Sequence, residues 1–121
     1  MNKKKRSEDE ILLSIINESI LEKKGENIII MNLQNLENPV TKYFVICSGA
    51  SSVHTNTLAE YIEYNVRQTI KERPWKKEGF ENCEWILLDY VTVVVHIFQP
   101  QSREFYNLEK LWADAEVVNT Y

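Results

Sequence analysis

The chain contains few of the residues on which many functional sites depend. Its 121 residues include three glycines, two cysteines and two histidines. A phosphate-cradling loop needs closely spaced glycines, and a structural zinc site needs four ligands in paired spacings, which Cys47, His54, Cys83 and His96 do not show. The two cysteines stand alone inside apolar runs, so we expect small buried thiols rather than a disulfide. We therefore expect no metal and no bound cofactor.

Long apolar segments are missing as well. No apolar run approaches the roughly 20 residues that a membrane helix requires. The first residues, MNKKKRSEDE, lack the apolar core of a signal peptide, so we expect a cytoplasmic protein. With 44% apolar and 26% charged residues, the chain suits one globular domain. We predict a flexible basic leader over residues 1–6, the domain over 7–116 and a tail over 117–121.

Acidic residues dominate the C-terminal part of the chain. From Glu78 onward eight acids and two bases give a charge of −6, which leaves +2 for the first 77 residues of a chain whose net charge is −4. Proteins that bind nucleic acids usually show the opposite, a basic stripe that neutralises phosphates. The acidic part fits a basic protein surface better, although acids that only keep the domain soluble would give the same count.

Hydrophobic periodicity predicts three helices and four strands. Ser7 opens the first helix in a capping box, and Gly25 should end it as a left-handed residue. Pro74 should end the second helix, and Ser102 should cap the third. The apolar stripes are Ile11, Leu12, Ile15, Ile16 and Ile20, then Leu58, Ala59, Ile62, Val66 and Ile70, then Phe105, Leu108, Leu111 and Trp112. The expected strands cover residues 28–33, 43–47, 85–90 and 93–98.

This order of elements predicts an α/β (α+β) fold with a mixed four-stranded sheet. The helix between the second and third strands permits a parallel crossover, and strands this apolar need helices on both faces. The last two strands should form a hairpin. Because Val91 resists a positive φ, we expect a turn wider than two residues between them. Residues 34–41 and 75–82 are expected to be a loop and a charged connection.

One turn could carry chemistry. Gly49 to Ser52 follows a strand and opens a helix, where backbone amides can meet an anion. A nucleotidyltransferase would need two carboxylates a residue apart after this turn to hold Mg²⁺, but Val53 and His54 follow instead. The start of a capped helix explains the turn more simply.

Aromatic and charged side chains near the C-terminus are the main contact candidates, because Trp, Tyr and Arg dominate the energetics of interfaces. They are Trp85, Asp89, Tyr90, Arg103, Tyr106 and Trp112. Each also has a plainer explanation. The tryptophans can belong to the core, and Asp89 can accept hydrogen bonds from turn amides. The composition leaves both interpretations open.

Four ordered segments resemble the motifs of one family. They are YFVICSGASSVH at residues 43–54, WILLDY at 85–90, VVHIFQP at 94–100 and REFYNLEKLW at 103–112. Together they resemble the ribosomal silencing factor family, also called Iojap-related, over nearly the whole chain. Two departures stand out. Val91 and Thr92 replace the family's usual glycine and acid, and Val53 replaces a basic residue.

The resemblance implies a nucleotidyltransferase-like topology without that enzyme's catalytic residues, and therefore a protein that is not an enzyme. It implies a translational repressor that binds the large ribosomal subunit through its fourteenth ribosomal protein and sterically blocks subunit joining under nutrient limitation. Free family members are often homodimers, and neither membrane association nor sequence-specific nucleic-acid binding is implied. The docking residues that the resemblance carries over are Trp85, Ile86, Asp89, Tyr90, Arg103 and Tyr106.

Two functions of other classes stay open at this point. A homodimeric interaction scaffold would use the aromatic C-terminal helix as its self-contact. A nucleotidyltransferase-like enzyme would use the turn from Ser48 to Ser52.

Overall fold

The computed structural model describes residues 7–120, which form four helices and six strands. The helices are α1 (Glu8–Glu22), α2 (Ser52–Ile70), α3 (Pro100–Tyr106) and α4 (Leu108–Leu111). The strands are β1 (Glu26–Asn32), β2 (Tyr43–Ser48), β3 (Lys76–Glu78), β4 (Trp85–Asp89), β5 (Val93–Phe98) and β6 (Glu116–Thr120). The expected leader, residues 1–6, and Tyr121 lie outside the described residues.

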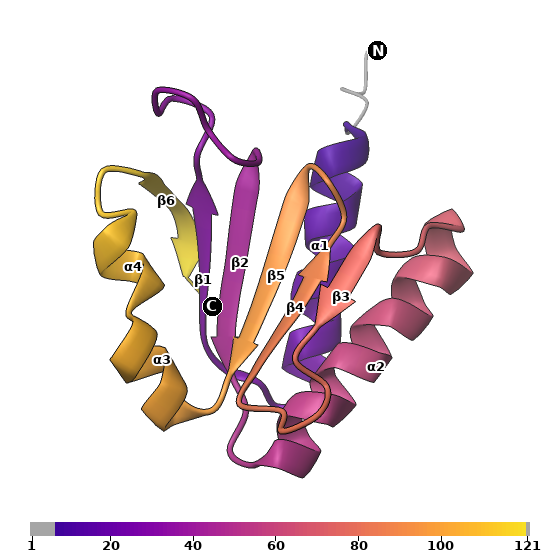
Figure 1. The fold of residues 1–121 in the computed structure, drawn as a ribbon. Helices are drawn as coiled ribbons and strands as arrows, with labels where there is room; N and C mark the ends of the chain where they lie inside the picture. The colour runs from indigo at the N-terminus through magenta and orange to yellow at the C-terminus, as the bar shows by residue number, and fades with distance from the viewer. Residues whose placement is uncertain (1–6, 121) are drawn as a thin grey trace.

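All six strands form one mixed sheet in the order β3-β4-β5-β2-β1-β6 (Figure 1). β2 and β5 run parallel at the centre, with Val45 opposite Val95, and the other neighbouring pairs are antiparallel. The element order predicted a parallel pair between the second and third expected strands, but β2 pairs in parallel with β5, the fourth, because β4 folds back on the outer side of β5. The connection between the parallel strands therefore contains β3 and β4 as well as α2. A mixed sheet flanked by helices is therefore confirmed, while the nucleotidyltransferase-like topology stays a prediction.

Two edge strands make the predicted count of four wrong. β3 forms inside the expected charged connection, where Lys76 pairs with Asp89 of β4. β6 forms where a tail was expected and pairs with β1 across an irregularity between Ile30 and Met31. An edge strand has only one neighbour and is held mainly by backbone hydrogen bonds. A strand held in this way does not need alternating apolar and polar side chains, and the sequence of these two segments lacks that pattern.

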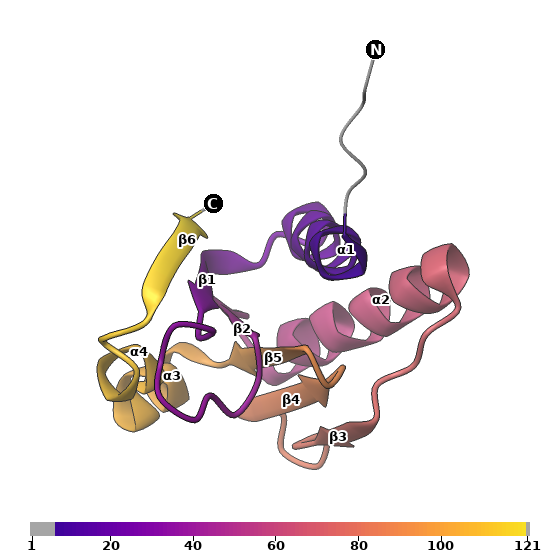
Figure 2. The same ribbon diagram turned by 90° about the horizontal axis from the view of Figure 1, so that it is seen from above.

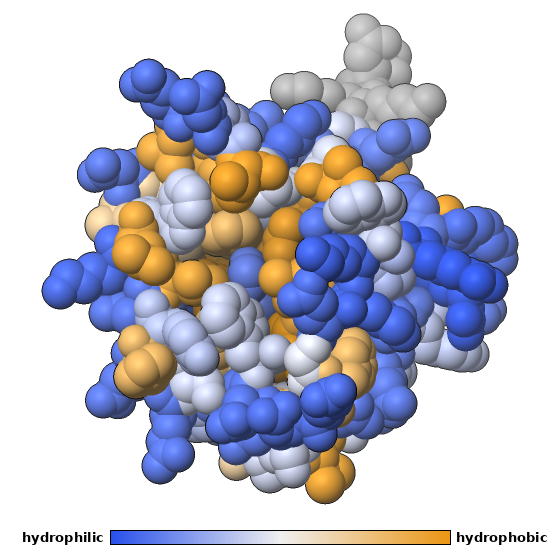
Figure 3. All heavy atoms as spheres, viewed as in Figure 1, coloured by the Kyte–Doolittle hydropathy of each residue, from blue (hydrophilic) through white to orange (hydrophobic). Residues whose placement is uncertain are grey.

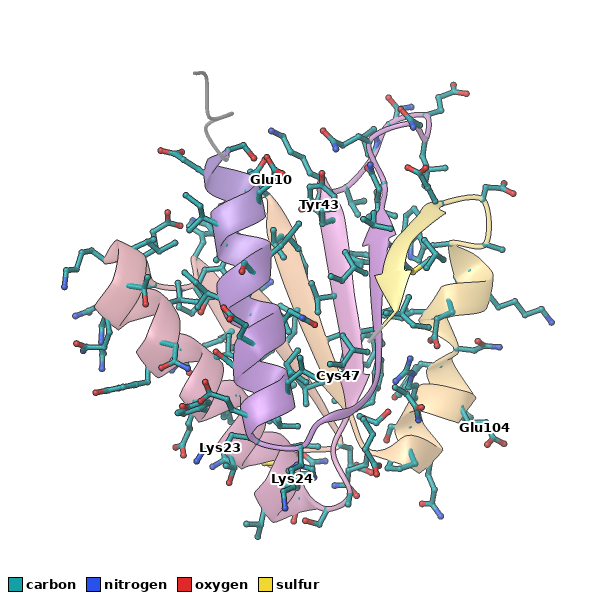
Figure 4. The ribbon with its side chains drawn as sticks, turned by 180° about the vertical axis from the view of Figure 1, so that it is seen from behind. Glu10, Lys23, Lys24, Tyr43, Cys47 and Glu104 are labelled. Carbon is teal, nitrogen blue, oxygen red and sulfur yellow. The ribbon has the colours of Figure 1, made fainter. Side chains whose placement is uncertain are left out.

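The strands alternate their side chains between two cores, as the pleat of a sheet requires. Val45, Ile86 and Val95 belong to the core under α1 and α2, the side seen in Figure 4. Phe44 and Phe98 belong to a smaller core shared with α4. The two pairs of helices lie on different sides of the sheet (Figure 2). This division decides which side chains of one strand can share a surface.

The two long helices bury the apolar stripes that the sequence predicted. α1 opens with the capping box of Ser7 and Glu10. The buried residues are Leu12, Ile16, Ser19 and Ile20 in α1, and Thr55, Leu58, Ala59, Ile62 and Val66 in α2. The left-handed residue after α1 is Lys24, at φ 62°, rather than Gly25. Across residues 7–120, every helix is too short or too polar to cross a membrane.

The predicted final helix is two short helices. Asn107, at φ 47°, separates α3 from α4. Because the chain changes direction there, Leu108 of the predicted stripe is buried, whereas Phe105 and Leu111 are exposed. α3 starts with Pro100 in its first turn and without a side-chain cap, so Ser102 is not the cap. Proline suits this position, because its missing N–H has no intrahelical partner there.

The β4–β5 hairpin is confirmed, and three residues, Tyr90 to Thr92, connect its strands, as a turn wider than two residues requires. Val91 nevertheless adopts the positive φ that the sequence argument excluded. The amide of Thr92 donates to the carbonyl of Tyr90 at 2.9 Å and closes a γ-turn centred on Val91, whose φ is 75°. The carboxylate of Asp89 accepts from the Val91 amide, and the hydroxyl of Thr41 donates to the Val91 carbonyl, both at 2.8 Å. These bonds hold Val91 in a conformation that β-branched residues avoid.

Candidate functional site

An aromatic stack joins the sheet to α3. Trp85, at the start of β4, lies opposite Phe98 of β5, and their ring centroids are 4.9 Å apart. Tyr106, at the end of α3, also packs on Trp85, with centroids 4.7 Å apart. Phe98 is fully buried, Trp85 is half-buried and Tyr106 is 47% exposed. The stack therefore runs from the core to the surface.

A buried histidine sets the orientation of this tryptophan. Trp85 Nε1 donates a hydrogen bond to Nδ1 of His96 at 3.1 Å. The Phe44 ring also packs against the His96 ring in an edge-to-face arrangement, with the two ring centroids 4.6 Å apart. Burial lowers the pKa of His96 from its ordinary 6.5 to about 4, so the ring is neutral near pH 7. Because Nδ1 accepts, the proton of the neutral ring is on Nε2.

Large side chains that are exposed or half-buried extend the stack into a surface, here called the aromatic face. Its members are Trp85, Phe105, Tyr106, Leu111 and Trp112. Phe105 is 81% exposed and Leu111 is 72% exposed. Exposure of such large apolar side chains to water is unfavourable, because their burial would stabilise the folded state. Figure 3 shows apolar patches over α3, α4 and the strands beside them. Such patches on a small domain often mark an interaction surface.

The six predicted docking residues do not share one surface. Trp85 and Asp89 point to the α3 side of β4, and Trp85 meets Tyr106. Ile86 is fully buried and Tyr90 is nearly so, both in the core under α1 and α2. A partner could reach these two only by opening that core. We therefore keep Trp85, Asp89 and Tyr106 as contact candidates and assign Ile86 and Tyr90 to packing.

Arg103, the sixth predicted residue, is engaged inside the domain. Its Nε and Nη2 donate to one carboxylate oxygen of Glu109, at 3.2 and 3.0 Å, and its Nη1 donates to the hydroxyl of Ser48 at 2.9 Å. The Arg103 side chain is only 11% exposed. It ties α3 to α4 and to the end of β2, so it positions Tyr106 rather than presenting a free charge.

The turn before α2 is the start of a helix. The hydroxyl of Ser51 accepts from the His54 amide at 3.1 Å as the N-cap. Both ring nitrogens of His54 are used, since Nδ1 accepts from the Ala50 amide and Nε2 donates to the Lys23 carbonyl. Burial raises the pKa of the Cys47 thiol to about 12, so it is not a nucleophilic thiolate. In the described part of the chain, no three His, Cys, Asp or Glu side chains cluster to hold a metal.

Sequence reasoning missed Phe105 and Leu111 as surface residues. Their helical spacing with Leu108 indicated a buried stripe, which would hold only if one helix ran through Asn107. An asparagine at this point is a weak signal of a left-handed break, because Asn tolerates that conformation better than other side chains.

The fold and this face define a small α/β domain that carries exposed aromatic and apolar side chains on α3 and α4 beside the first residue of β4. The chain belongs to the ribosomal silencing factor family, since the family model described as "Ribosomal silencing factor during starvation" matches residues 4–120. The resemblance of the four motifs to this family is thereby confirmed.

Individual relatives agree with the family. The chain is 34% identical over 112 residues to ribosomal silencing factor RsfS of Halalkalibacterium halodurans, covering 93% of each protein. It is 36% identical over 74 residues to the mouse protein named "Mitochondrial assembly of ribosomal large subunit protein 1", covering 60% of this chain and 32% of that one. A crystal structure of a protein from Chromobacterium violaceum matches with a TM-score of 0.82 and 26% identity over 88% of both chains.

Proposed function

We propose that this protein is a translational repressor that docks on the large ribosomal subunit through the aromatic face and blocks joining of the small subunit. The observation that carries the proposal is the stack of Tyr106 on Trp85, which leaves a preorganised aromatic anchor at the surface. The family supports a ribosomal partner, and the name of the mouse relative points to the large subunit. We further infer, from the family resemblance, that the fourteenth large-subunit protein is the docking site and that the protein acts in the cytoplasm.

The charge around the aromatic face suits a basic partner. From residue 103 to 116, four acids accompany two bases. One of the bases, Arg103, is already paired with Glu109. Glu104 points outward from α3, away from the sheet (Figure 4). A basic ribosomal protein would complement these acids, and its association should weaken with rising salt.

Steric occlusion fits a surface of this kind. It requires a shape that fits, a charge that matches and a few buried anchors, because the bound molecule itself excludes the competing subunit. Truncation of a central aromatic anchor typically costs about 2 kcal/mol or more of binding free energy, roughly a thirtyfold loss of affinity. The proposal therefore depends on single side chains that can be changed without entering the core.

Co-sedimentation with purified large subunits tests the docking surface. Phe105→Ala and Tyr106→Ala should each be depleted from the ribosomal pellet, because each removes an exposed aromatic of the face. Tyr64→Ala on α2 is the matched control, since Tyr64 is similarly exposed and lies outside the face. If all three folded variants pellet like the parent chain, this face is not the docking surface.

Self-association is a second candidate for the same side chains. The exposed Phe105 and Leu111 could be covered by a second copy of the chain when no ribosome is present. Sedimentation equilibrium of Leu111→Ala beside the parent chain tests this, and an unchanged mass distribution would exclude Leu111 from a self-contact.

A further inference from the structure

A second surface, of a different chemical character, lies at the C-terminal end of α2 and along β3. Its side chains line a groove of about 300 Å³. The groove, here called the basic groove, is lined by Arg67, Arg73, Trp75, Lys76 and Lys77, together with Glu63 and Pro74. The groove lies at the β3 edge of the sheet, whereas β6 forms the opposite edge (Figure 1).

The segment that forms most of the basic groove is positively charged, although the chain as a whole is acidic. Residues 67–77 hold five bases and one acid, Glu72, a charge of +4 within a chain of net charge −4. Four of the fourteen bases precede Ser7, so half of the remaining ten fall within these eleven positions. Such clustering creates a local positive potential although the whole molecule repels anions.

The positively charged side chains of the basic groove are available to bind an added anion. The guanidinium groups of Arg67 and Arg73 have no ion pair or hydrogen bond among residues 7–120. Lys76 pairs with Glu78 at 2.9 Å, and Lys77 pairs with Glu63 at 3.1 Å. The Lys76–Glu78 pair is about half exposed on both sides, and Lys77 is about half exposed although Glu63 is more buried. Ion pairs at the surface contribute little to stability. A phosphate could therefore replace either carboxylate at low cost.

A rigidly held tryptophan stands among these cations. The Trp75 amide donates to the Asp89 carbonyl at 2.7 Å, and Pro74 restricts the chain just before it. The Trp75 side chain is nevertheless 75% exposed, and within the described residues its ring has no aromatic or cationic partner. The domain thus fixes the backbone of Trp75 while leaving its indole open, an arrangement that packing alone does not explain.

We propose that the basic groove binds the backbone of single-stranded RNA, with a base stacked on Trp75 and phosphates on Arg67 and Arg73. An open indole face stacks on any base, and arginine offers forked donors that match phosphate oxygens. Recognition of this kind is independent of sequence, because every base has a π-face and every nucleotide has a phosphate.

This activity goes beyond docking through the aromatic face and does not depend on it. The groove and the aromatic face share no residue. A free oligonucleotide therefore tests the groove without ribosomes, and failure of either proposal leaves the other unaffected. If both hold, the protein contacts the ribosome through protein on one side and through RNA on the other.

Fluorescence anisotropy with a labelled single-stranded RNA of about ten nucleotides, close to the site size of single-strand binders, tests the proposal. The complete chain is used throughout, so its N-terminal lysines contribute equally to every variant. Arg67→Glu combined with Arg73→Glu should weaken binding more than tenfold. It should also lower the slope of log affinity against log salt by about 1.4, because each phosphate contact contributes about 0.7. Trp75→Ala should weaken binding about tenfold, and Trp75→Phe should restore most of the loss.

A charge-matched control separates the groove from net charge. Lys24→Glu combined with Lys110→Glu makes the same change at exposed sites outside the groove and should bind nearly as the parent chain does. Equal losses in both double variants, or unchanged binding by Trp75→Ala, would overturn the proposal. Displacement of the RNA by poly-glutamate at equal charge concentration would also overturn it and would point to an acidic protein partner instead.

Discussion

The indole nitrogen of Trp85 donates to Nδ1 of His96 across neighbouring strands, at 3.1 Å. This hydrogen bond links the surface to the core, because Tyr106 packs on Trp85 while His96 is buried against Phe44. It also requires that His96 stay neutral, since a protonated ring has no acceptor nitrogen. The orientation of Trp85, and with it the packing of Tyr106, is thus linked to the protonation of a core residue.

Acid should destabilise the fold through His96. Its folded pKa of about 4 lies below the ordinary 6.5, so the unfolded chain binds more protons between these values. The contribution of His96 is fully present above pH 6.5 and is lost as the pH falls towards 4. Between about pH 7 and pH 5 the loss is about 2 kcal/mol, to be measured by urea unfolding at both values.

A variant without the titrating ring is the control for this pH dependence. His96→Phe leaves the Trp85 nitrogen unpaired and lowers stability at every pH, but it removes the share of the slope that His96 supplies. The carboxylates titrate equally in both proteins and cancel in the comparison. Parallel stability curves for the parent chain and His96→Phe would show that His96 is not buried as the structure has it.

Replacing Val91 by glycine should stabilise the protein. Val91 holds φ 75° at the centre of a γ-turn, a strained position that costs a non-glycine residue about 1–3 kcal/mol. Glycine removes the strain but adds entropy to the unfolded chain, which leaves a net gain of about 1 kcal/mol. The midpoint of urea unfolding should therefore rise for Val91→Gly and not for Val91→Ala. A lower midpoint for the glycine variant would contradict the turn.

The hydroxyl of Tyr90 should be dispensable for folding. Burial raises the pKa of the Tyr90 phenol, and its oxygen has no hydrogen-bond partner within the described residues. Removing a buried polar group that lacks a partner recovers about 1 kcal/mol of desolvation free energy. Tyr90→Phe should thus be as stable as the parent chain or more so, with unchanged co-sedimentation, whereas Tyr90→Ala should lose about 3 kcal/mol. Clear destabilisation of Tyr90→Phe would reveal a partner for the hydroxyl.

The Arg103–Glu109 pair should anchor the two short helices. Arg103→Ala leaves Glu109 and the Ser48 hydroxyl without their partner in a largely buried site, at a cost of about 2 kcal/mol. Lys110→Ala, a nearby exposed base, should change stability by less than about 0.5 kcal/mol. Chemical unfolding measures both, and equal small effects would show that Arg103 is not an anchor.

The sequence predicted the helices and central strands because burial imposes a period on them. The stripe on α2 and the apolar run of β2 both have this origin. β3 could not be predicted, since its Lys-Lys-Glu carries no apolar side chain to bury and is held by hydrogen bonds to β4. The positive φ of Val91 was mispredicted because the local preference of valine is overridden by hydrogen bonds to Asp89 and to Thr41, the latter distant in sequence.

The sequence indicated the motif that contains Trp85, but the prediction did not say which side chains of that motif lie on the same side of the sheet. The segment WILLDY was singled out as one contact site, but its side chains divide between the two faces of the sheet. Alternation along a strand already places Ile86 opposite to Trp85, so this signal was present in the sequence. The role of Arg103 had no such signal, because Ser48 meets it only through the packing of α3 against the end of β2.

A subunit-joining assay measures the proposed steric occlusion itself. Purified small and large subunits are mixed with increasing amounts of the protein, and the fraction of joined ribosomes is read from sucrose gradients. Steric occlusion predicts that this fraction falls as the protein saturates the large subunit, and that Phe105→Ala and Tyr106→Ala need much higher concentrations while Tyr64→Ala acts like the parent chain. An undiminished joined fraction at concentrations where the protein co-sediments with large subunits would contradict it.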